Sequence, residues 1–183
     1  MALRTLRLFG DDILYKKSKP VRNFDAKLHD LLEDMWDTIY EYDGIGLAAV
    51  QVGTLRRIVL LRLPENDDNP EEECYELLNP EILETEGESL HDGEACLSVP
   101  GKAGKVLRPD RIKISACDRD GEAFEVEFED TLATVLSHEL DHLDGVLFLD
   151  KAESVWDRKP EDEERESSQS KSNPSKSSKG KKR

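Results

Sequence analysis

The stretch His138-Glu139-Leu140-Asp141-His142 lies near the end of a largely apolar segment that begins at about Asp130. On a helix, residues four positions apart differ by about 40° in direction, so the two histidines share one face. Two imidazoles on a partly buried face need polar partners, and one metal ion can serve both. The glutamate beside the first histidine can act as a general base without binding the ion. The stretch therefore predicts a metal-binding helix that starts near Asp130, which can cap it, and stops before Gly145.

A catalytic metal site needs a third protein ligand and an open position for water. Gluzincin and metzincin proteases take their third ligand from a residue at a set distance after the second histidine. Neither pattern is found after His142, where the chain continues Leu143-Asp144-Gly145-Val146-Leu147. Cys96 is the alternative ligand. A lone cysteine is most often a small buried hydrophobe, which is our interpretation of Cys74 and Cys117. The residues alone leave that interpretation open for Cys96 as well.

Apolar periodicity predicts the elements around this helix. Strands in the middle of the chain, flanked by two helices, predict an α+β domain with a mainly antiparallel sheet. The Asp120-Gly121 pair indicates a hairpin. We expect loops at 10–23 and 65–73, an amphipathic helix from Asp25 to about Tyr42, strands at 58–63, 74–83 (interrupted at Asn79-Pro80), 111–117 and 124–128, and a segment at 146–149 that packs or pairs.

The segment Gly44-Ile45-Gly46-Leu47-Ala48-Ala49 formally matches the GxGxxA pattern of dinucleotide-binding folds. That pattern must follow a strand and open a helix, but here it follows the first helix and precedes a strand. Dinucleotide binding is therefore rejected. What remains is a tight loop of small residues that leads to Gln51, whose side-chain amide has two N–H donors.

Three motifs in one order resemble the peptide deformylase family, in which they read GxGLAAxQ, EGCLS and HExDH. They stand here at residues 44–51, 94–98 and 138–142, and the likeness covers residues 3–152. Two positions depart from the family pattern: Ala95 replaces the glycine of EGCLS, and Ser137 replaces the glutamine before HExDH. Ala95 adds a Cβ where the substrate backbone is expected, but neither change removes a group that hydrolysis needs.

The resemblance implies an α+β fold with mainly antiparallel β-sheets packed around the central HExxH helix, and an amphipathic helix near the N-terminus. It implies a hydrolase that removes the formyl group from the formyl-methionine of newly synthesised polypeptides and releases formate. It also implies a single divalent metal ion, physiologically Fe²⁺, with Zn²⁺, Ni²⁺ or Co²⁺ as alternatives that suit the same ligands.

The resemblance also assigns roles to residues. Cys96, His138 and His142 would bind the metal ion. Glu139 would act as general acid and base, while the Gln51 amide and the Leu97 N–H would stabilise the oxyanion. The residues expected to contact the substrate are Gly44, Ile45, Gly46, Ala95 and Arg108.

Two other functions stay open. HExxH also occurs in general metallopeptidases, and a Cys-His-His set can belong to a structural zinc site in a non-catalytic module. A structural site needs a fourth protein ligand. His91, shortly before Cys96, is a better candidate for it than His29 on the first helix, and both are weak candidates.

The composition divides the chain in two. Its 183 residues carry a formal net charge of −15, yet residues 167–183 contain six basic side chains and no acidic ones. We expect a catalytic domain at residues 1–152 and a charged, disordered tail at 153–183. The acidic body disfavours general nucleic-acid binding, whereas the basic tail suits a transient contact with ribosomal RNA.

Three cysteines without regular spacing predict no disulfide framework, which is typical of a reducing compartment. No apolar run is long enough for a signal peptide or for a membrane span. We therefore expect a cytoplasmic protein without membrane contact.

Overall fold

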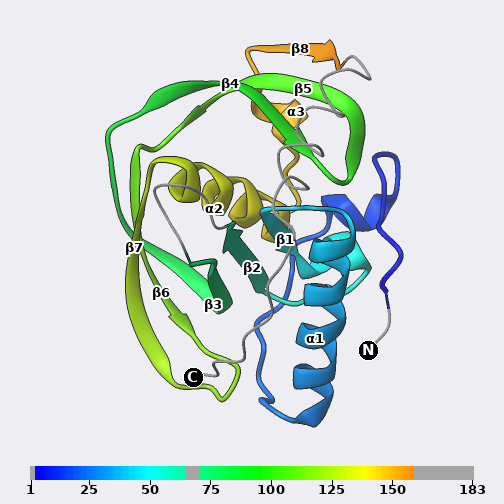
Figure 1. The fold of residues 1–183 in the computed structure, drawn as a ribbon, viewed down its shortest axis with the longest axis vertical. Coiled ribbons are helices and arrows are strands. Elements are labelled where there is room, and N and C mark those ends of the chain that lie inside the picture. The colour runs from blue at the N-terminus through cyan, green and yellow to red at the C-terminus, as the bar shows by residue number, and fades with distance from the viewer. Residues whose placement is uncertain (1–2, 65–70, 159–183) are drawn as a thin grey trace.

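The computed structural model describes residues 3–64 and 71–158 (Figure 1). Most of the loop expected at 65–73, and the tail from residue 159 onward, lie outside the described residues. Two antiparallel sheets enclose the helix α2 (Asp130–Leu143), as Figure 1 shows. No helix in the described part of the chain is long and apolar enough to cross a bilayer.

The larger sheet has five strands in the order β1-β2-β3-β6-β7, and each neighbouring pair is antiparallel. The predicted α+β class is confirmed. The strands are β1 (Gly46–Ala48), β2 (Ile58–Leu63), β3 (Glu73–Glu86), β6 (Arg111–Cys117) and β7 (Ala123–Glu129).

The strand β2 lies at the centre of the core because both of its faces are covered. Ile58 and Leu60 pack in the cluster that contains the buried side chains of the first long helix. Val59 and Leu61 pack in the cluster that contains the buried side chains of α2. A strand covered on both faces needs apolar residues at successive positions, which explains the continuous apolar run in this segment.

Two helices cover the two faces of this sheet. Asp25, where the first helix was expected to begin, caps α1 (Ala26–Glu41), because its carboxylate accepts a hydrogen bond from a backbone N–H of the first turn at 3.1 Å. The helix α2 occupies the predicted residues, but the predicted cap is wrong. Glu129, at the end of β7, holds the cap position without a side-chain bond, so Asp130 is already the first helical residue.

The smaller sheet consists of β4 (Ser89–Cys96), β5 (Val99–Arg108) and β8 (Ser154–Asp157), in the order β4-β5-β8. The sequence predicted none of these strands. Residues 94–100, around Cys96, form the end of β4, its tight connection to β5 and the start of β5. The strand β8 pairs with β5, so regular structure continues beyond residue 152, where the tail was expected to begin.

One expected interruption proves to be a bulge. The strand β3 continues through Asn79-Pro80, and its register against β6 shifts between Leu78 and Glu81. Asn79 has a φ of 52°, and its side-chain amide bonds both the N–H and the C=O of Val21, at 2.7 and 2.9 Å. An extra residue in one strand therefore bends β3 without ending it.

Three short helical segments complete the described elements. The segment η1 (Asp12–Tyr15) lies within the stretch expected to be a loop, and η2 (Ala49–Val52) follows β1 directly. The segment α3 (Phe148–Lys151) overlaps the apolar run that was expected to pack or pair, and Phe148 is buried in a cluster with Cys96.

Candidate active site

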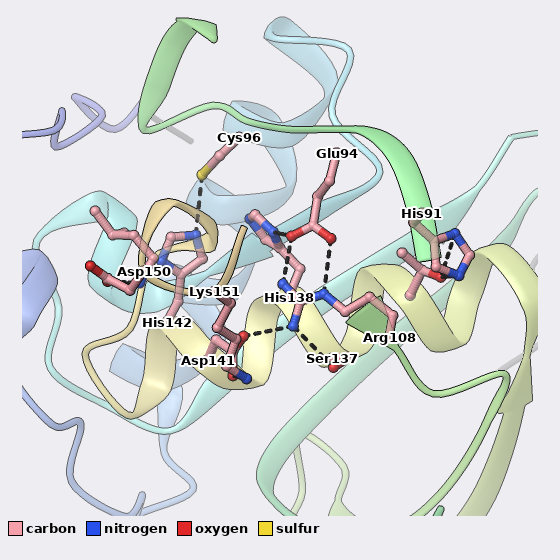
Figure 2. Close-up of polar contacts among 12 residues, drawn as sticks. His91, Glu94, Cys96, Arg108, Ser137, His138, Asp141, His142, Asp150 and Lys151 are labelled. Atoms are coloured by element: carbon pink, nitrogen blue, oxygen red, sulfur yellow. Dashed lines mark hydrogen bonds and ion pairs between the residues drawn. The ribbon is translucent and has the colours of Figure 1, made fainter. Parts of the chain in front are cut away.

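Cys96, His138 and His142 meet between the two sheets (Figure 2). Their ligand atoms all lie within 4.8 Å of one another, and all three side chains are buried. The Cys96 Sγ atom is 3.2 Å from His142 Nε2. The histidines come from successive turns of α2, and Cys96 is the last residue of β4. The three residues that the resemblance assigned to a metal ion are thus brought together by two different layers of the fold.

Glu94 orients one of these histidines. Its Oε1 atom is 2.6 Å from His138 Nδ1, which leaves the other ring nitrogen available as a ligand. The two oxygens of the same carboxylate accept hydrogen bonds from Nε and Nη2 along one edge of the Arg108 guanidinium, at 2.9 and 2.5 Å (Figure 2). Burial alone would raise the pKa of Glu94, but Arg108 and His138 outweigh burial and lower that pKa to about 2. Glu94 is therefore an anion that holds His138 in place. No role was predicted for it.

Arg108 was expected to contact the substrate, but its surroundings favour another role. The side chain is 1% exposed. Besides Glu94, its guanidinium donates to Asp141 Oδ2 at 2.6 Å and to Ser137 Oγ at 3.2 Å. Asp141 also accepts from Lys151 at 2.7 Å. Because these acceptors occupy the guanidinium, we infer that Arg108 positions β5 and Glu94 against α2.

Gln51 directs its amide nitrogen at the ligand cluster. Its Oε1 atom accepts a hydrogen bond from the Ala48 N–H at 2.7 Å, which fixes the orientation of the amide. Its Nε2 atom consequently lies 3.7 Å from Cys96 Sγ and 3.2 Å from Ser98 Oγ. A buried donor beside the ligand cluster is what stabilisation of an oxyanion requires.

Glu139 is buried between α2 and β1. Burial raises the pKa of its carboxyl to about 7, although the neighbouring charge of His138 lowers it. Within the described residues, its Oε2 atom has no hydrogen-bond partner. Gly46 lies so close that a Cβ there would be 2.5 Å from Glu139 Oε1 and 2.7 Å from Val135 Cγ1. The absence of a side chain at Gly46 thus keeps the place of the Glu139 carboxylate open.

The other residues expected to contact substrate lie on two neighbouring segments. Gly44 approaches the connection that follows β4, since a Cβ on Gly44 would lie 3.0 Å from Leu97 Cδ1. Ile45, which precedes β1, keeps 38% of its side chain exposed. Ala95 is exposed beside Cys96 on β4.

The two remaining histidines do not join the cluster. His91 Nε2 is 3.0 Å from Thr134 Oγ1, and His29 Nε2 is 2.9 Å from the carbonyl oxygen of Arg119. Over residues 3–64 and 71–158, the cluster of Cys96, His138 and His142 is the one group of potential metal ligands that the fold brings together. The site therefore offers three ligands, as an open catalytic site does, and not the four of a structural one.

The cluster fits a divalent metal ion by the chemistry of its donors. One thiol and two imidazoles suit Zn²⁺, Fe²⁺ and neighbouring transition metals. Burial lowers the pKa of both imidazoles. At His138 the charge of Cys96 and hydrogen bonds with Cys96 and Glu94 outweigh burial and hold the pKa well above its usual range, while the pKa of His142 stays well below it. A bound cation would compete with protons for these ligand atoms.

The family model for polypeptide deformylase matches residues 3–158. The chain belongs to this family. Curated deformylases are similar over nearly their whole length. The chain is 45% identical to the peptide deformylase of Thermoanaerobacter pseudethanolicus, over 91% of this chain and 99% of that relative. It is 50% identical to that of Caldicellulosiruptor bescii, over 82% and 86%.

Solved deformylases share the fold as well. The structure from Thermotoga maritima is 38% identical, with a TM-score of 0.76, over 84% of this chain and all of that one. A structure from Acinetobacter baumannii with Met-Ala-Ser bound is 32% identical, with a TM-score of 0.75, over 82% and 98%. The deformylase match thus extends through β8, which the sequence had placed in the tail.

Proposed function

We propose that this deformylase hydrolyses the formyl group of formyl-methionyl polypeptides and releases formate and a free amino terminus. The main support is the convergence of three buried ligands, the Glu139 carboxylate and the Gln51 amide nitrogen at one place. Peptide binding is carried over from the Acinetobacter baumannii relative, which has Met-Ala-Ser bound.

A divalent ion on Cys96, His138 and His142 would supply Lewis acidity, which lowers the pKa of water and polarises the formyl carbonyl. Glu139 accepts a proton from the water that attacks the formyl carbon, and it returns the proton to the leaving amine as the C–N bond breaks. A carboxyl whose pKa is about 7 can do both near neutral pH. The Gln51 amide and the Leu97 N–H donate hydrogen bonds to the oxygen that gains charge.

The peptide itself would bind beside β1. This strand is at the edge of the five-stranded sheet, so its free side can pair with an extended chain. We assign the main-chain contacts to Gly44, Ile45 and Gly46, with Ala95 on the opposite segment. The close approach of Gly46 to Glu139 leaves little room near the reacting carbon, which favours formyl over the larger acetyl group.

Formate release separates this proposal from the two alternatives. The metal-loaded enzyme should release formate from formyl-Met-Ala-Ser, leave acetyl-Met-Ala-Ser intact and not cut an unblocked protein. Cleavage of the unblocked protein would indicate a general metallopeptidase. Full metal loading without any hydrolysis would indicate a structural site instead.

We also propose Fe²⁺ as the physiological ion, because the family resemblance implies it and the donor set accepts it. Metal analysis after purification without oxygen tests this choice. Predominant Zn²⁺, Ni²⁺ or Co²⁺ under those conditions would contradict it. We place the enzyme in the cytoplasm, where nascent chains are made, and we propose that the basic tail contacts ribosomal RNA transiently.

A further inference from the structure

A cavity lies at the start of α1, where the chain that leads into this helix pairs with the segment after η2. Its volume is about 640 Å³, within the range of small-molecule sites. Its lining, which we call the apolar floor, includes Val21 and Leu28, both 7% exposed. None of the residues assigned to the metal ion or to the formyl substrate lines it. The residues around it are Lys19, Pro20, Val21, Arg22, Asn23, Asp25, Lys27, Leu28, Leu31, Thr54 and Arg56.

The cavity gathers basic side chains that have no acidic partner. In the described part of the chain, nearly every Lys and Arg side chain lies within ion-pair distance of a carboxylate or has another partner. The exceptions there are Lys16 and the four basic residues of the cavity, which are Lys19, Arg22, Lys27 and Arg56. In a chain with 41 acidic residues, such a cluster is not a consequence of the overall charge.

The backbone holds two of these four basic residues side by side. Lys19 and Arg56 form an isolated parallel bridge, with the Lys19 N–H donating to Leu55 at 3.2 Å and the Arg57 N–H donating to Lys19 at 2.9 Å. The one carboxylate in the cavity, Asp25, already accepts from the N–H of Leu28 as the cap of α1. Like charges held close together repel one another, so an anion that binds among them gains more than it would at an isolated lysine.

We propose that this cavity binds a compact polyphosphate anion, such as pyrophosphate or the phosphates of a nucleoside di- or triphosphate. Two guanidinium groups and two ammonium groups can neutralise adjacent phosphates, with bidentate hydrogen bonds from Arg22 and Arg56. The apolar floor can accept the uncharged part of a nucleotide. A long nucleic acid would extend beyond the cavity over a chain whose formal net charge is −15 and be repelled, whereas a compact anion fits within the cavity.

Calorimetric titration of the full-length, metal-loaded enzyme with pyrophosphate at low salt tests the site. We expect saturable binding at one site, weakened about tenfold by Lys19→Gln, as loss of one charged hydrogen bond implies. Lys16→Gln is the matched control, because Lys16 is also unpaired and lies three residues away, outside the cavity. It should leave the affinity unchanged. Equal metal content before and after titration confirms that pyrophosphate has not extracted the ion.

Three results would overturn the proposal. The first is the absence of saturable binding to the unsubstituted enzyme. The second is an equal affinity of both variants, which would place the anion on the tail or the metal ion. The third is binding of a single-stranded RNA that depends on Lys19 and that pyrophosphate does not displace. Amide shifts that pyrophosphate induces at residues 19–28 and 54–56, and that Lys19→Gln abolishes, would support the site independently.

Discussion

Glu139 has a carboxylate that is buried next to two metal-binding positions but is not one of the three clustered ligands. We expect Glu139→Ala to retain the metal ion and to lose at least ~10²-fold in turnover, the lower end for loss of a general acid–base group. Formate release and metal content should be measured on the same sample. Turnover near that of the unsubstituted enzyme, at full metal content, would remove Glu139 from the mechanism.

Cys96 supplies the sulfur of the cluster. Cys96→Ala should bind metal poorly because one of three protein ligands is lost, whereas Cys74→Ala, at an exposed thiol, should bind it normally. Equal occupancy of the two variants after dialysis would place the third ligand elsewhere. A thiolate beside a redox-active ion also makes the Fe²⁺ enzyme sensitive to air, so its activity should decline faster than that of the Zn²⁺ or Ni²⁺ enzyme.

Glu94 acts through His138 rather than on the substrate. Glu94→Gln should weaken metal binding about 10- to 100-fold, as loss of a partner that orients a ligand does. Competition with a chelator measures this change. Glu81→Gln, at an exposed position of β3, is the control and should have no effect. If Glu94→Gln lowers turnover at saturating metal but leaves metal affinity intact, its role lies with the substrate instead.

At the scale of residues, the sequence predicted the three metal ligands better than it predicted the side chains that hold those ligands in place. The HExxH spacing fixes two ligands on one helical face, and a family motif pointed to Cys96. The Glu94–Arg108 pair joins residues of two strands whose pairing no local pattern indicated. One signal was available: Glu94 is two residues before Cys96, and alternate residues of a strand share a face.

At the scale of elements, prediction succeeded where a segment carries its own periodicity. The helix α1, the strand β2 and the β6–β7 hairpin at Asp120-Gly121 formed as expected. The β4–β5 hairpin was missed because β4 faces solvent with one side and has few apolar residues on the other. Its stability comes from contacts with β8 and α2, which are distant in the sequence.

The contact between β1 and α2 can be tested at Gly46. In Gly46→Ala, the added Cβ would fall 2.5 Å from Glu139 Oε1, so the carboxylate must move. We expect turnover to fall at least ~10²-fold, as with loss of the general base itself, at normal metal content. The exposed neighbour Ile45, changed to alanine, should affect substrate affinity more than turnover. Unchanged turnover of Gly46→Ala would show that the carboxylate tolerates displacement.

At the scale of the whole molecule, two truncations separate the tail from the fold. Removal of residues 167–183 should leave turnover on a short formyl peptide and the melting temperature unchanged, because the sequence of this segment offers little apolar surface to bury. Removal of everything after residue 152 also deletes β8, which pairs with four residues of β5. That loss of hydrogen bonds, about 2 kcal/mol, should lower the melting temperature by roughly 4–8 °C.

Both truncated chains should be compared by thermal denaturation in the presence of the same metal. An equal melting temperature after removal of β8 would contradict its structural role. For the tail, co-sedimentation with ribosomes across a salt series gives the second test. If the full-length and shortened chains sediment alike at low salt, the tail does not contact the ribosome.

The origin of the three ligands in different layers has a mechanical consequence. Cys96 belongs to the small sheet, whereas both histidines belong to a helix that packs on the large one. A cation bound by all three would join the two layers, in addition to the Glu94–His138 and Arg108–Asp141 contacts that already link β4 and β5 to α2. Oxidation of the Cys96 sulfur would remove the link through the cation and leave the side-chain contacts in place. A single chemical change would thereby weaken the attachment of the β4–β5 hairpin to α2 at the end that carries Cys96.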